Sequence, residues 1–279
     1  MATIQWYPGH MNKARNQLEE KLGLIDVLVE VLDARIPQSS RNPMIEQLVA
    51  DKPHLIILNK ADLADPIMTK KWQKKLAGKD KLVMAVDSLH NTNVQAIVHM
   101  IKKLAAKKVQ KLEARGASNP VIRIALVGVP NCGKSTIINR LVGHNVAAVG
   151  NKPGVTKGQS WLKTNTNIQI LDTPGILWPK FDDQDVGYKL AIFGAIKDSI
   201  FHADDVALFL VQLLRKYYFN DLVKFARSST EVVKNINDTD LLLAMTEMYG
   251  MRDDYERFSL YLLQRLRKGK AGRITLDRL

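Results

Sequence analysis

Residues 121–142 combine an apolar, β-branched run, a turn that contains glycine and a run with helical spacing. The turn fits the spacing G-x-x-x-x-G-K-[ST], typical of a loop that binds phosphate, with Gly128, Gly133, Lys134 and Ser135. Glycines let backbone N–H groups approach phosphate oxygens, and the positive end of the following helix points at the same place. We expect Lys134 to reach the β- and γ-phosphates and Ser135 to offer its hydroxyl to Mg²⁺. A chance glycine turn is the alternative, which the flanking strand and helix disfavour.

A second motif follows another apolar run, residues 54–58, and consists of Asn59, Lys60, Ala61 and Asp62. N-K-x-D at the end of a parallel strand is typical of a loop that recognises guanine. The Asp62 carboxylate can accept hydrogen bonds from guanine N1–H and from the 2-amino group, whereas adenine has neither donor there. Adenine would leave that carboxylate unpaired, which costs about 1–3 kcal/mol or more. We expect the Asn59 side chain to brace the base and the loop.

A third polar loop follows the apolar run at residues 82–86 and contains Ser88. Loops at this place can offer backbone N–H groups to guanine O6. The match is loose, because Leu89 and His90 replace the usual Ala and Lys.

Two more segments can contact the γ-phosphate and its metal ion. Thr156 ends a P-G-V-T segment, and its hydroxyl could complete the Mg²⁺ shell. Asp172 opens a D-x-x-G segment after a buried run, so its carboxylate can reach Mg²⁺ through a water. The N–H of Gly175 can contact the γ-phosphate, and both loops can be ordered by that group and released on its loss.

Apolar periodicity predicts the elements that must position these loops. Buried strands are expected at residues 24–32, 54–58, 82–86 and 121–127, with a hairpin at 161–163 and 168–171. Helices are expected at residues 12–22, 68–76 and 94–112, and almost throughout residues 182–279. The pattern predicts an α/β nucleotide-binding domain with a mostly parallel sheet between helices, residues 1–181, and an all-helical C-terminal domain, residues 182–279.

The motifs stand in an unusual order. GTPases usually carry the P-loop first, then D-x-x-G, then N-K-x-D, whereas here Asn59 precedes the P-loop glycine Gly128 by about seventy residues. This order is a circular permutation of the same sheet, which is tolerated because termini and cut points lie in exposed loops. The segment after Gly175 then leads directly into the C-terminal region.

Composition limits the classes of function. The chain has 279 residues, 46% of them hydrophobic, which is enough for a sizeable core and two domains. A net charge of +13 and a pI near 9.7 favour a polyanionic partner such as nucleic acid, with a solvated basic surface as the alternative. Cys132 is the single cysteine, so no disulfide within the chain is possible and a reducing compartment is expected. No apolar run approaches the ~18 residues of a membrane span, and we expect no membrane partner.

At this point the sequence resembles the circularly permuted ribosome-assembly GTPases of the YlqF/RbgA type. The resemblance rests on WYPGHM near the start, DARIP with SSRNP, NKAD, GVPNCGKST, PGVT and DTPG. It implies binding of GTP and GDP by a set of residues that comprises Asn59, Lys60, Asp62, Ser88, Asn131, Cys132, Gly133, Lys134, Ser135, Thr136, Thr156 and Gly175. It also implies Mg²⁺ held by Ser135, Thr156 and Asp172.

The resemblance also bears on the catalytic group. Many GTPases carry a water-orienting Gln directly after D-x-x-G, but here that position is Ile176, which cannot orient a water. In the family the histidine of the P-G-H motif, His10, is the implied catalytic residue. Asn131 resembles the asparagine of potassium-stimulated GTPases, in which its side-chain oxygen helps to hold K⁺ against the phosphates.

The implied partner is the immature large (50S) ribosomal subunit and its rRNA, in the bacterial cytoplasm. The GTP form would bind the particle late in its assembly, the particle would stimulate hydrolysis, and hydrolysis would release the factor, which we expect to be a monomer. Two alternatives stay open: a GTPase that acts on another RNA, such as a tRNA-modification or translation factor, and a P-loop ATPase or nucleotide-sensing scaffold.

The end of the chain is basic and interrupted by glycines. It could follow a phosphate backbone, with a frayed tail as the alternative, through Arg265, Arg267, Lys268, Lys270 and Arg273.

Overall fold

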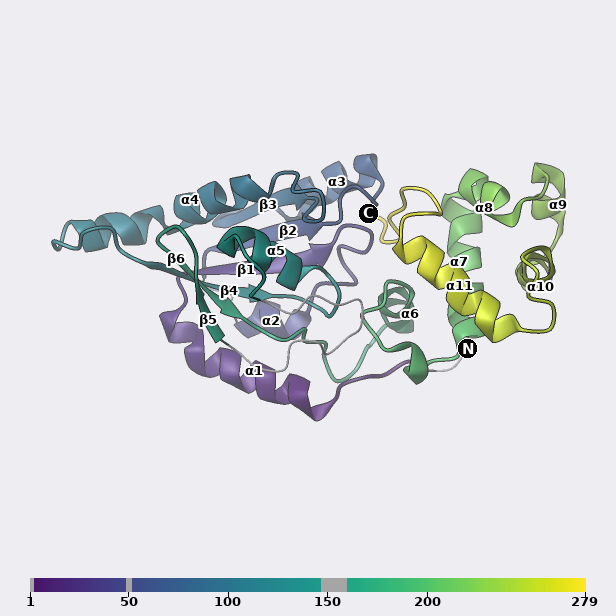
Figure 1. Ribbon diagram of the computed structural model, residues 1–279, viewed down its shortest axis with the longest axis horizontal. Coiled ribbons are helices and arrows are strands. Elements are labelled where there is room, and N and C mark those ends of the chain that lie inside the picture. Colours follow the sequence, from purple (N-terminus) through teal and green to yellow (C-terminus); the bar gives the residue numbers. More distant parts are fainter. Residues whose placement is uncertain (1–2, 49–51, 147–159) are drawn as a thin grey trace.

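The computed structural model describes residues 3–48, 52–146 and 160–279 of the chain. Figure 1 shows an elongated molecule, with a sheet flanked by helices at one end and a group of helices at the other. The predicted fold class, a mostly parallel α/β unit followed by a helical region, is confirmed.

In the described part of the chain, one six-stranded sheet has the order β3-β2-β1-β4-β6-β5. Its strands are β1 (Val27–Asp33), β2 (His54–Asn59), β3 (Lys81–Val86), β4 (Ile122–Val127), β5 (Ser160–Lys163) and β6 (Ile168–Asp172). Every pair is parallel except the predicted β5–β6 hairpin. β1 and β2 are buried along their whole length, as expected for central strands covered on both faces. β1 begins later than predicted, because Leu22–Leu24 form a 3₁₀ turn.

Helices cover both faces of this sheet. They are α1 (Gly9–Lys21), α2 (Pro43–Leu48), α3 (Pro66–Leu76), α4 (Val94–Glu113) and α5 (Lys134–Val142). Side chains alternate along β2, so Ile56 packs in the cluster that contains α3 and Ile57 in the cluster that contains α4. The Asp65 side chain caps α3 by accepting hydrogen bonds from two backbone N–H groups, and Pro66 occupies the first helical position.

The C-terminal region is helical, as predicted. Its helices are α6 (Gln184–Ile192), α7 (Ala203–Tyr217), α8 (Phe219–Ala226), α9 (Thr230–Asn235), α10 (Asp238–Met248) and α11 (Tyr255–Arg267), with a short 3₁₀ turn at Asp198–Ile200. α7 lies at the centre and packs against α6, α8, α10 and α11 (Figure 1). Its apolar stripe, including Val206, Leu210 and Leu214, is buried as the helical spacing predicted.

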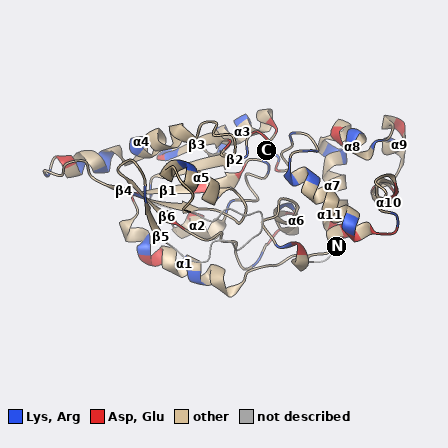
Figure 2. Cartoon of the chain, in the orientation of Figure 1, with Lys and Arg blue, Asp and Glu red and all other residues tan. Residues whose placement is uncertain are grey.

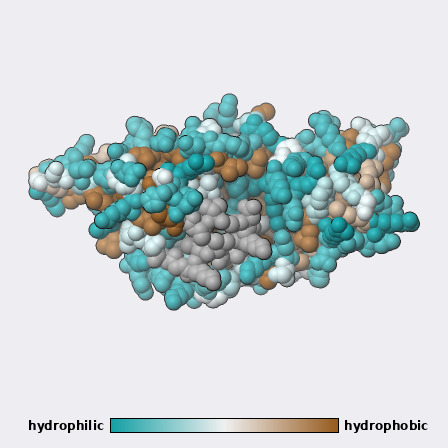
Figure 3. Space-filling model, in the orientation of Figure 1, coloured by the Kyte–Doolittle hydropathy of each residue, from teal (hydrophilic) through white to brown (hydrophobic). Residues whose placement is uncertain are grey.

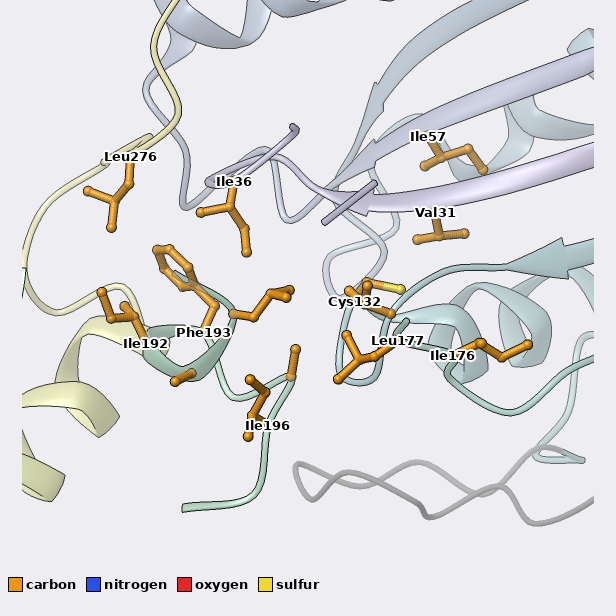
Figure 4. Packing of buried hydrophobic residues seen from close by; sticks show 14 of the residues in the cluster. Val31, Ile36, Ile57, Cys132, Ile176, Leu177, Ile192, Phe193, Ile196 and Leu276 are labelled. Carbon is orange, nitrogen blue, oxygen red and sulfur yellow. The ribbon is translucent and has the colours of Figure 1, made fainter. Parts of the chain in front are cut away.

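The two parts of the molecule share one hydrophobic core. Val31 and Ile57 of the sheet, Ile36 of the following loop, Phe193 after α6 and Leu276 near the C-terminus belong to one cluster (Figure 4). The chain returns from α11 to the sheet, so the C-terminus lies beside the α/β unit (Figure 1). The predicted alternative of a frayed tail is therefore wrong, because residues 274–277 are buried. The domain boundary between residues 181 and 182 stays a prediction.

Candidate nucleotide site at the carboxyl edge of the sheet

The parallel strands bring the polar motifs to one edge of the sheet. Asp33 at the end of β1 is paired in register with Asn59 at the end of β2. Leu126 of β4 is paired with Asp172 at the end of β6, and the P-loop begins directly after β4. In parallel α/β sheets ligands bind outside the carboxyl ends of the strands, so this edge is where a nucleotide is expected.

The P-loop wraps around the ammonium group of Lys134. Lys134 is buried, and its Nζ donates hydrogen bonds to the carbonyl oxygens of Gly128, at 3.0 Å, and Val129, at 3.1 Å. Gly133 has a φ of +102°, which a residue with a Cβ rarely adopts. Ser135 and Thr136 are half-buried in the first turn of α5, where N–H groups and the helix dipole favour an anion.

Asn59 joins the guanine-type motif to the P-loop. Its Nδ2 donates to the carbonyl oxygen of Cys132 at 2.8 Å, and its Oδ1 accepts from the N–H of Ser88 at 3.2 Å. Gly133 passes so close that an added Cβ would lie 2.1 Å from the Asn59 Nδ2. The structure thus brings together three motifs that are far apart in the sequence.

Lys60 makes a second connection to the same loop. Its Nζ donates to the carbonyl oxygen of Asn131 and to Asp33 Oδ2, the latter at 3.0 Å. Asp33 in turn accepts two hydrogen bonds from the guanidinium group of Arg35, which is 1% exposed. Burial by itself would raise the pKa of Asp33, but the charges of Arg35 and Lys60 hold the pKa well below its usual range.

Arg35 of the DARIP motif therefore connects the end of β1 to the helical region, a role that its residue type alone did not reveal. Arg35 also donates from Nη1 to the carbonyl oxygen of Arg267 at 3.1 Å and lies over the ring of Phe193, 4.2 Å from its centroid. Its position directly after a buried strand, at the edge that carries the other motifs, was the available signal for a role at the site.

Asp62 is half-buried beside a second carboxylate, Asp87. Burial and the negative charge of Asp87 raise the pKa of Asp62. Asp87 is held by His90, whose Nδ1 lies 2.6 Å from Asp87 Oδ2, and it accepts hydrogen bonds from the backbone N–H groups of Leu89 and His90. The sequence pattern indicated no role for Asp87, although this residue opens the loop that contains Ser88.

Asp172 fits the metal role expected for it. Its Oδ1 is buried and has no hydrogen-bond partner among the described residues. Burial raises the pKa of Asp172, and the nearby charge of Lys134 opposes that shift. A water bound to Mg²⁺ would satisfy this oxygen, so a carboxylate here and a hydroxyl at Ser135 form a donor set of the kind that Mg²⁺ prefers. Thr156, the third expected ligand, lies outside the described residues.

The segment after Asp172 packs closely against the P-loop. The Ile176 N–H donates to the carbonyl oxygen of Gly128 at 3.2 Å. A Cβ at Gly175 would lie 2.7 Å from backbone atoms of Pro130, so glycine is required there. The side chain of Ile176 is buried in the core, which agrees with the expectation that it orients no water.

His10 is exposed in the first turn of α1, next to this same segment. The neighbouring Met11 is buried, and its Sδ accepts a hydrogen bond from the N–H of Leu177 at 3.4 Å. Met11, the residue after His10, therefore lies beside the residues that follow D-x-x-G, although the two segments are distant in the sequence.

Asn131, the residue expected at a potassium site, contacts the helical region. Its Nδ2 donates to the carbonyl oxygen of Gly194, which follows α6. Gly194 has a φ of +75° and lies against the guanidinium group of Arg267. Arg267 pairs with Asp198 at 2.8 Å and donates to two carbonyl oxygens of α6, so it is bound to protein rather than presented to a phosphate backbone.

Comparisons with known proteins indicate the family of this chain. The family described as 50S ribosome-binding GTPase matches residues 123–247, which begin at the P-loop strand and exclude the N-K-x-D segment. Ribosome biogenesis GTPase A of Priestia megaterium is 43% identical over 279 residues, covering 99% of this chain and 96% of that protein. Mitochondrial ribosome-associated GTPase 1 of Mus musculus is 31% identical, covering 98% of this chain and 90% of that protein.

A solved structure has the same fold. GNP-bound YlqF from Thermotoga maritima superposes with a TM-score of 0.65 and 25% sequence identity, covering 95% of this chain and 98% of that one. With the joined motifs and the full-length relatives, this likeness identifies the chain as a GTP-hydrolysing enzyme that takes part in ribosome assembly and belongs to the ribosome biogenesis GTPase A family.

Proposed function

We propose that the GTP-bound form of this protein binds an immature large ribosomal subunit late in its assembly, and that hydrolysis releases it. The observation that carries this proposal is the direct contact of Asn59 with the P-loop carbonyl of Cys132, which supports a single site for base recognition and phosphate binding. The segment after Gly175 packs on that loop, so a change at the γ-phosphate can reach the C-terminal region.

The positions of the site residues support the following roles. Asp62 and the Ser88 loop hold the guanine, with Asn59 and Lys60 as braces. Gly133, Lys134 and the N–H groups of residues 131–136 hold the phosphates, and the Gly175 N–H contacts the γ-phosphate.

The bound metal would be Mg²⁺, which neutralises phosphate charge when present. It would be held by Ser135, Thr156 and, through a water, Asp172. Asn131 is proposed as a K⁺ ligand on the basis of the resemblance; comparing GTP turnover in K⁺ and in Na⁺ tests this role.

His10 is proposed to orient the attacking water through a hydrogen bond from its imidazole. Its place beside the segment after D-x-x-G supports this role, since Met11 and Leu177 are in contact. Because His10 is exposed on a helix end, a partner that covers this face is needed to fix its side chain. We therefore propose slow turnover for the isolated protein and faster turnover on the ribosomal particle.

Charge and surface character support an RNA partner. Figure 2 shows Lys and Arg spread over α3, α4 and α11. The face shown in Figure 3 is mostly hydrophilic, with hydrophobic residues in small patches. A net charge of +13 would attract the phosphate backbone of rRNA.

None of the helices in the described residues combines the length and the apolar character that a membrane span needs. We propose a monomeric factor of the bacterial cytoplasm, whose helical region, residues 182–279, contacts rRNA.

Sedimentation with purified 50S precursors tests the proposal. We expect the protein to sediment with the particles in a non-hydrolysable GTP analogue and to remain in the supernatant with GDP. Equal sedimentation with both nucleotides would refute release on hydrolysis. Preferential binding to free tRNA would refute the large subunit as partner.

A further inference from the structure

The last residues of the chain run back across the loop that carries Asp62. We name residues 60–65 the guanine-recognition loop and residues 273–277 the C-terminal strap. Backbone and side-chain hydrogen bonds join the strap to the loop. The Ile274 N–H donates to Leu63 O at 3.2 Å, and Arg273 donates to the carbonyl oxygens of Ala61 and Ala64, each at 3.0 Å. The two carbonyls that Arg273 holds lie on either side of Asp62 in the chain.

Thr275 of the strap links this loop to the neighbouring one. Its Oγ1 donates to the carbonyl oxygen of Ala34 and accepts from the Asp65 N–H, both at 3.2 Å. The Leu276 N–H donates to Arg35 O at 2.7 Å. The strap thus lies between the loop after β1 and the loop after β2, and it holds both at the edge where the nucleotide is expected.

Tyr218, between α7 and α8, connects the helical region to the same point. Its hydroxyl accepts a hydrogen bond from the Thr275 N–H at 2.8 Å. The same hydroxyl lies 3.1 Å from both Asp65 Oδ2 and Thr275 O and can donate its proton to either of them. Burial raises the pKa of Tyr218 to about 12, so the hydroxyl keeps its proton and remains a donor.

We propose that the C-terminal strap braces the guanine-recognition loop, so that discrimination of the base depends on Tyr218 and Arg273 as positioning residues. This inference rests on the proposed assignment of Asp62 to guanine. Neither residue need touch the nucleotide: both act by fixing the backbone that carries the Asp62 carboxylate.

The backbone of the loop and its expected ligand both call for support from outside the loop. The backbone of Lys60 has a φ of +59°, which residues other than glycine rarely adopt. The loop therefore leaves β2 through a strained residue. A carboxylate that accepts two hydrogen bonds from one base must be placed to a fraction of an ångström. The brace also couples two regions, because whatever moves α7 relative to the sheet changes the position of Thr275 and Asp65.

Tyr218→Phe removes only the hydroxyl and gives the sharpest test, with Tyr217→Phe as the matched control. The Tyr217 hydroxyl makes no hydrogen bond to any residue in the described part of the chain. The probe is the ratio of the affinities for GDP and inosine diphosphate, which lacks the 2-amino group that Asp62 would bind. We expect Tyr218→Phe to lower that ratio about three- to tenfold, because the hydrogen bonds of the hydroxyl to Thr275 and Asp65 are lost, and Tyr217→Phe to leave it unchanged.

A general loss of stability would lower the affinities for GDP and inosine diphosphate equally and leave their ratio unchanged. Arg273→Ala provides a second test should Tyr218→Phe fold poorly, because Arg273 is exposed, and Lys270→Ala controls for loss of charge nearby. We expect Arg273→Ala to lower the ratio as well, with partial recovery in Arg273→Lys. Linkage requires the reverse effect too, so GDP should slow amide hydrogen exchange at residues 274–276 more than inosine diphosphate does.

The outcomes separate the two proposals. If the unmodified protein binds GDP and inosine diphosphate equally, the assignment of Asp62 fails, and the brace fails with it. If it discriminates between them but Tyr218→Phe and Arg273→Ala keep the full ratio, the site assignment stands and the brace is refuted.

Discussion

Asn59 Nδ2 donates a hydrogen bond to the carbonyl oxygen of Cys132 at 2.8 Å, across 73 residues of sequence. This bond joins the end of β2, which leads to Asp62, to the P-loop, which carries Lys134. The order of the motifs along the chain is permuted, yet the structure brings them to one edge of the sheet, as the proposed nucleotide site requires. The contact therefore supports the proposal that two distant segments hold one guanine nucleotide.

Removing this bond should damage both stability and binding. Asn59 is 1% exposed, so Asn59→Ala leaves the Cys132 carbonyl and the Ser88 N–H buried without their partner. We expect the free energy of unfolding to fall by about 2 kcal/mol, and GDP affinity to fall at least tenfold. Urea unfolding and fluorescence titration measure these effects. Asn16→Ala, on the exposed face of α1, is the control, and equal behaviour of the two variants would contradict the account.

Guanine binding should depend on pH through Asp62. Only the ionised carboxylate accepts both hydrogen bonds, and burial with the charge of Asp87 raises the pKa of Asp62 above the usual value of about 3.9. GDP affinity should therefore be full at neutral pH and fall as the pH drops through that raised pKa, by up to about tenfold per pH unit.

Asp87→Asn supplies the matched comparison, because it removes the neighbouring charge but keeps an oxygen for the N–H groups of Leu89 and His90. The loss of affinity should then move to lower pH. A loss at the same pH in both proteins would show that the Asp87 charge does not act on Asp62.

A side chain at Gly175 should disturb the contact between the D-x-x-G segment and the P-loop. In Gly175→Ala the new Cβ would lie 2.7 Å from the backbone of Pro130, which cannot move aside like a side chain. We expect turnover of GTP to fall at least tenfold and the melting temperature to drop by several degrees. Gly78→Ala is the control, because a Cβ there meets nothing within 4 Å, and it should change neither value. Unchanged turnover and melting temperature in Gly175→Ala would refute the required close packing.

The metal requirement should depend on Asp172. Asp172→Asn keeps the shape but removes the charge of the buried Oδ1 that has no partner among the described residues. We expect the Mg²⁺ concentration for half-maximal GTP turnover to rise about tenfold, and chelation with EDTA to abolish turnover in the unmodified protein. The exposed Asp182→Asn serves as the control. An unchanged Mg²⁺ requirement in Asp172→Asn would remove this residue from the metal site.

His10 should affect hydrolysis and not binding. His10→Ala should keep its affinity for GTP but lose about tenfold or more of its particle-stimulated turnover, because the attacking water is no longer oriented. Single-turnover hydrolysis on 50S particles gives the rate, and His99→Ala, exposed on α4, is the control. Full stimulated turnover in His10→Ala would exclude a catalytic role.

The sequence allowed much of the fold and the expected edge of the site to be predicted, for a physical reason. The P-loop, N-K-x-D and D-x-x-G each follow an apolar strand, and parallel strands must bring such loops to one edge. Periodicity also predicted the β5–β6 hairpin and the C-terminal helices, which the structure confirms.

What could not be predicted depends on pairings between distant segments. Nothing in the residues around Arg35 indicates that it would bind Asp33 and the Arg267 carbonyl together. The basic residues near the C-terminus suggested contact with phosphate, whereas Arg267 and Arg273 bind carbonyl groups of this chain. These carbonyl groups belong to the backbone, which carries no sequence signal, and the one carboxylate that Arg267 binds, Asp198, lies 69 residues away in the chain.

Titration of GDP and ADP into the unmodified protein and into Asp62→Ala tests the central claim most directly. We predict that the unmodified protein binds GDP at least about tenfold more tightly than ADP, and that Asp62→Ala loses most of this preference. Equal affinity of the unmodified protein for both nucleotides would contradict it.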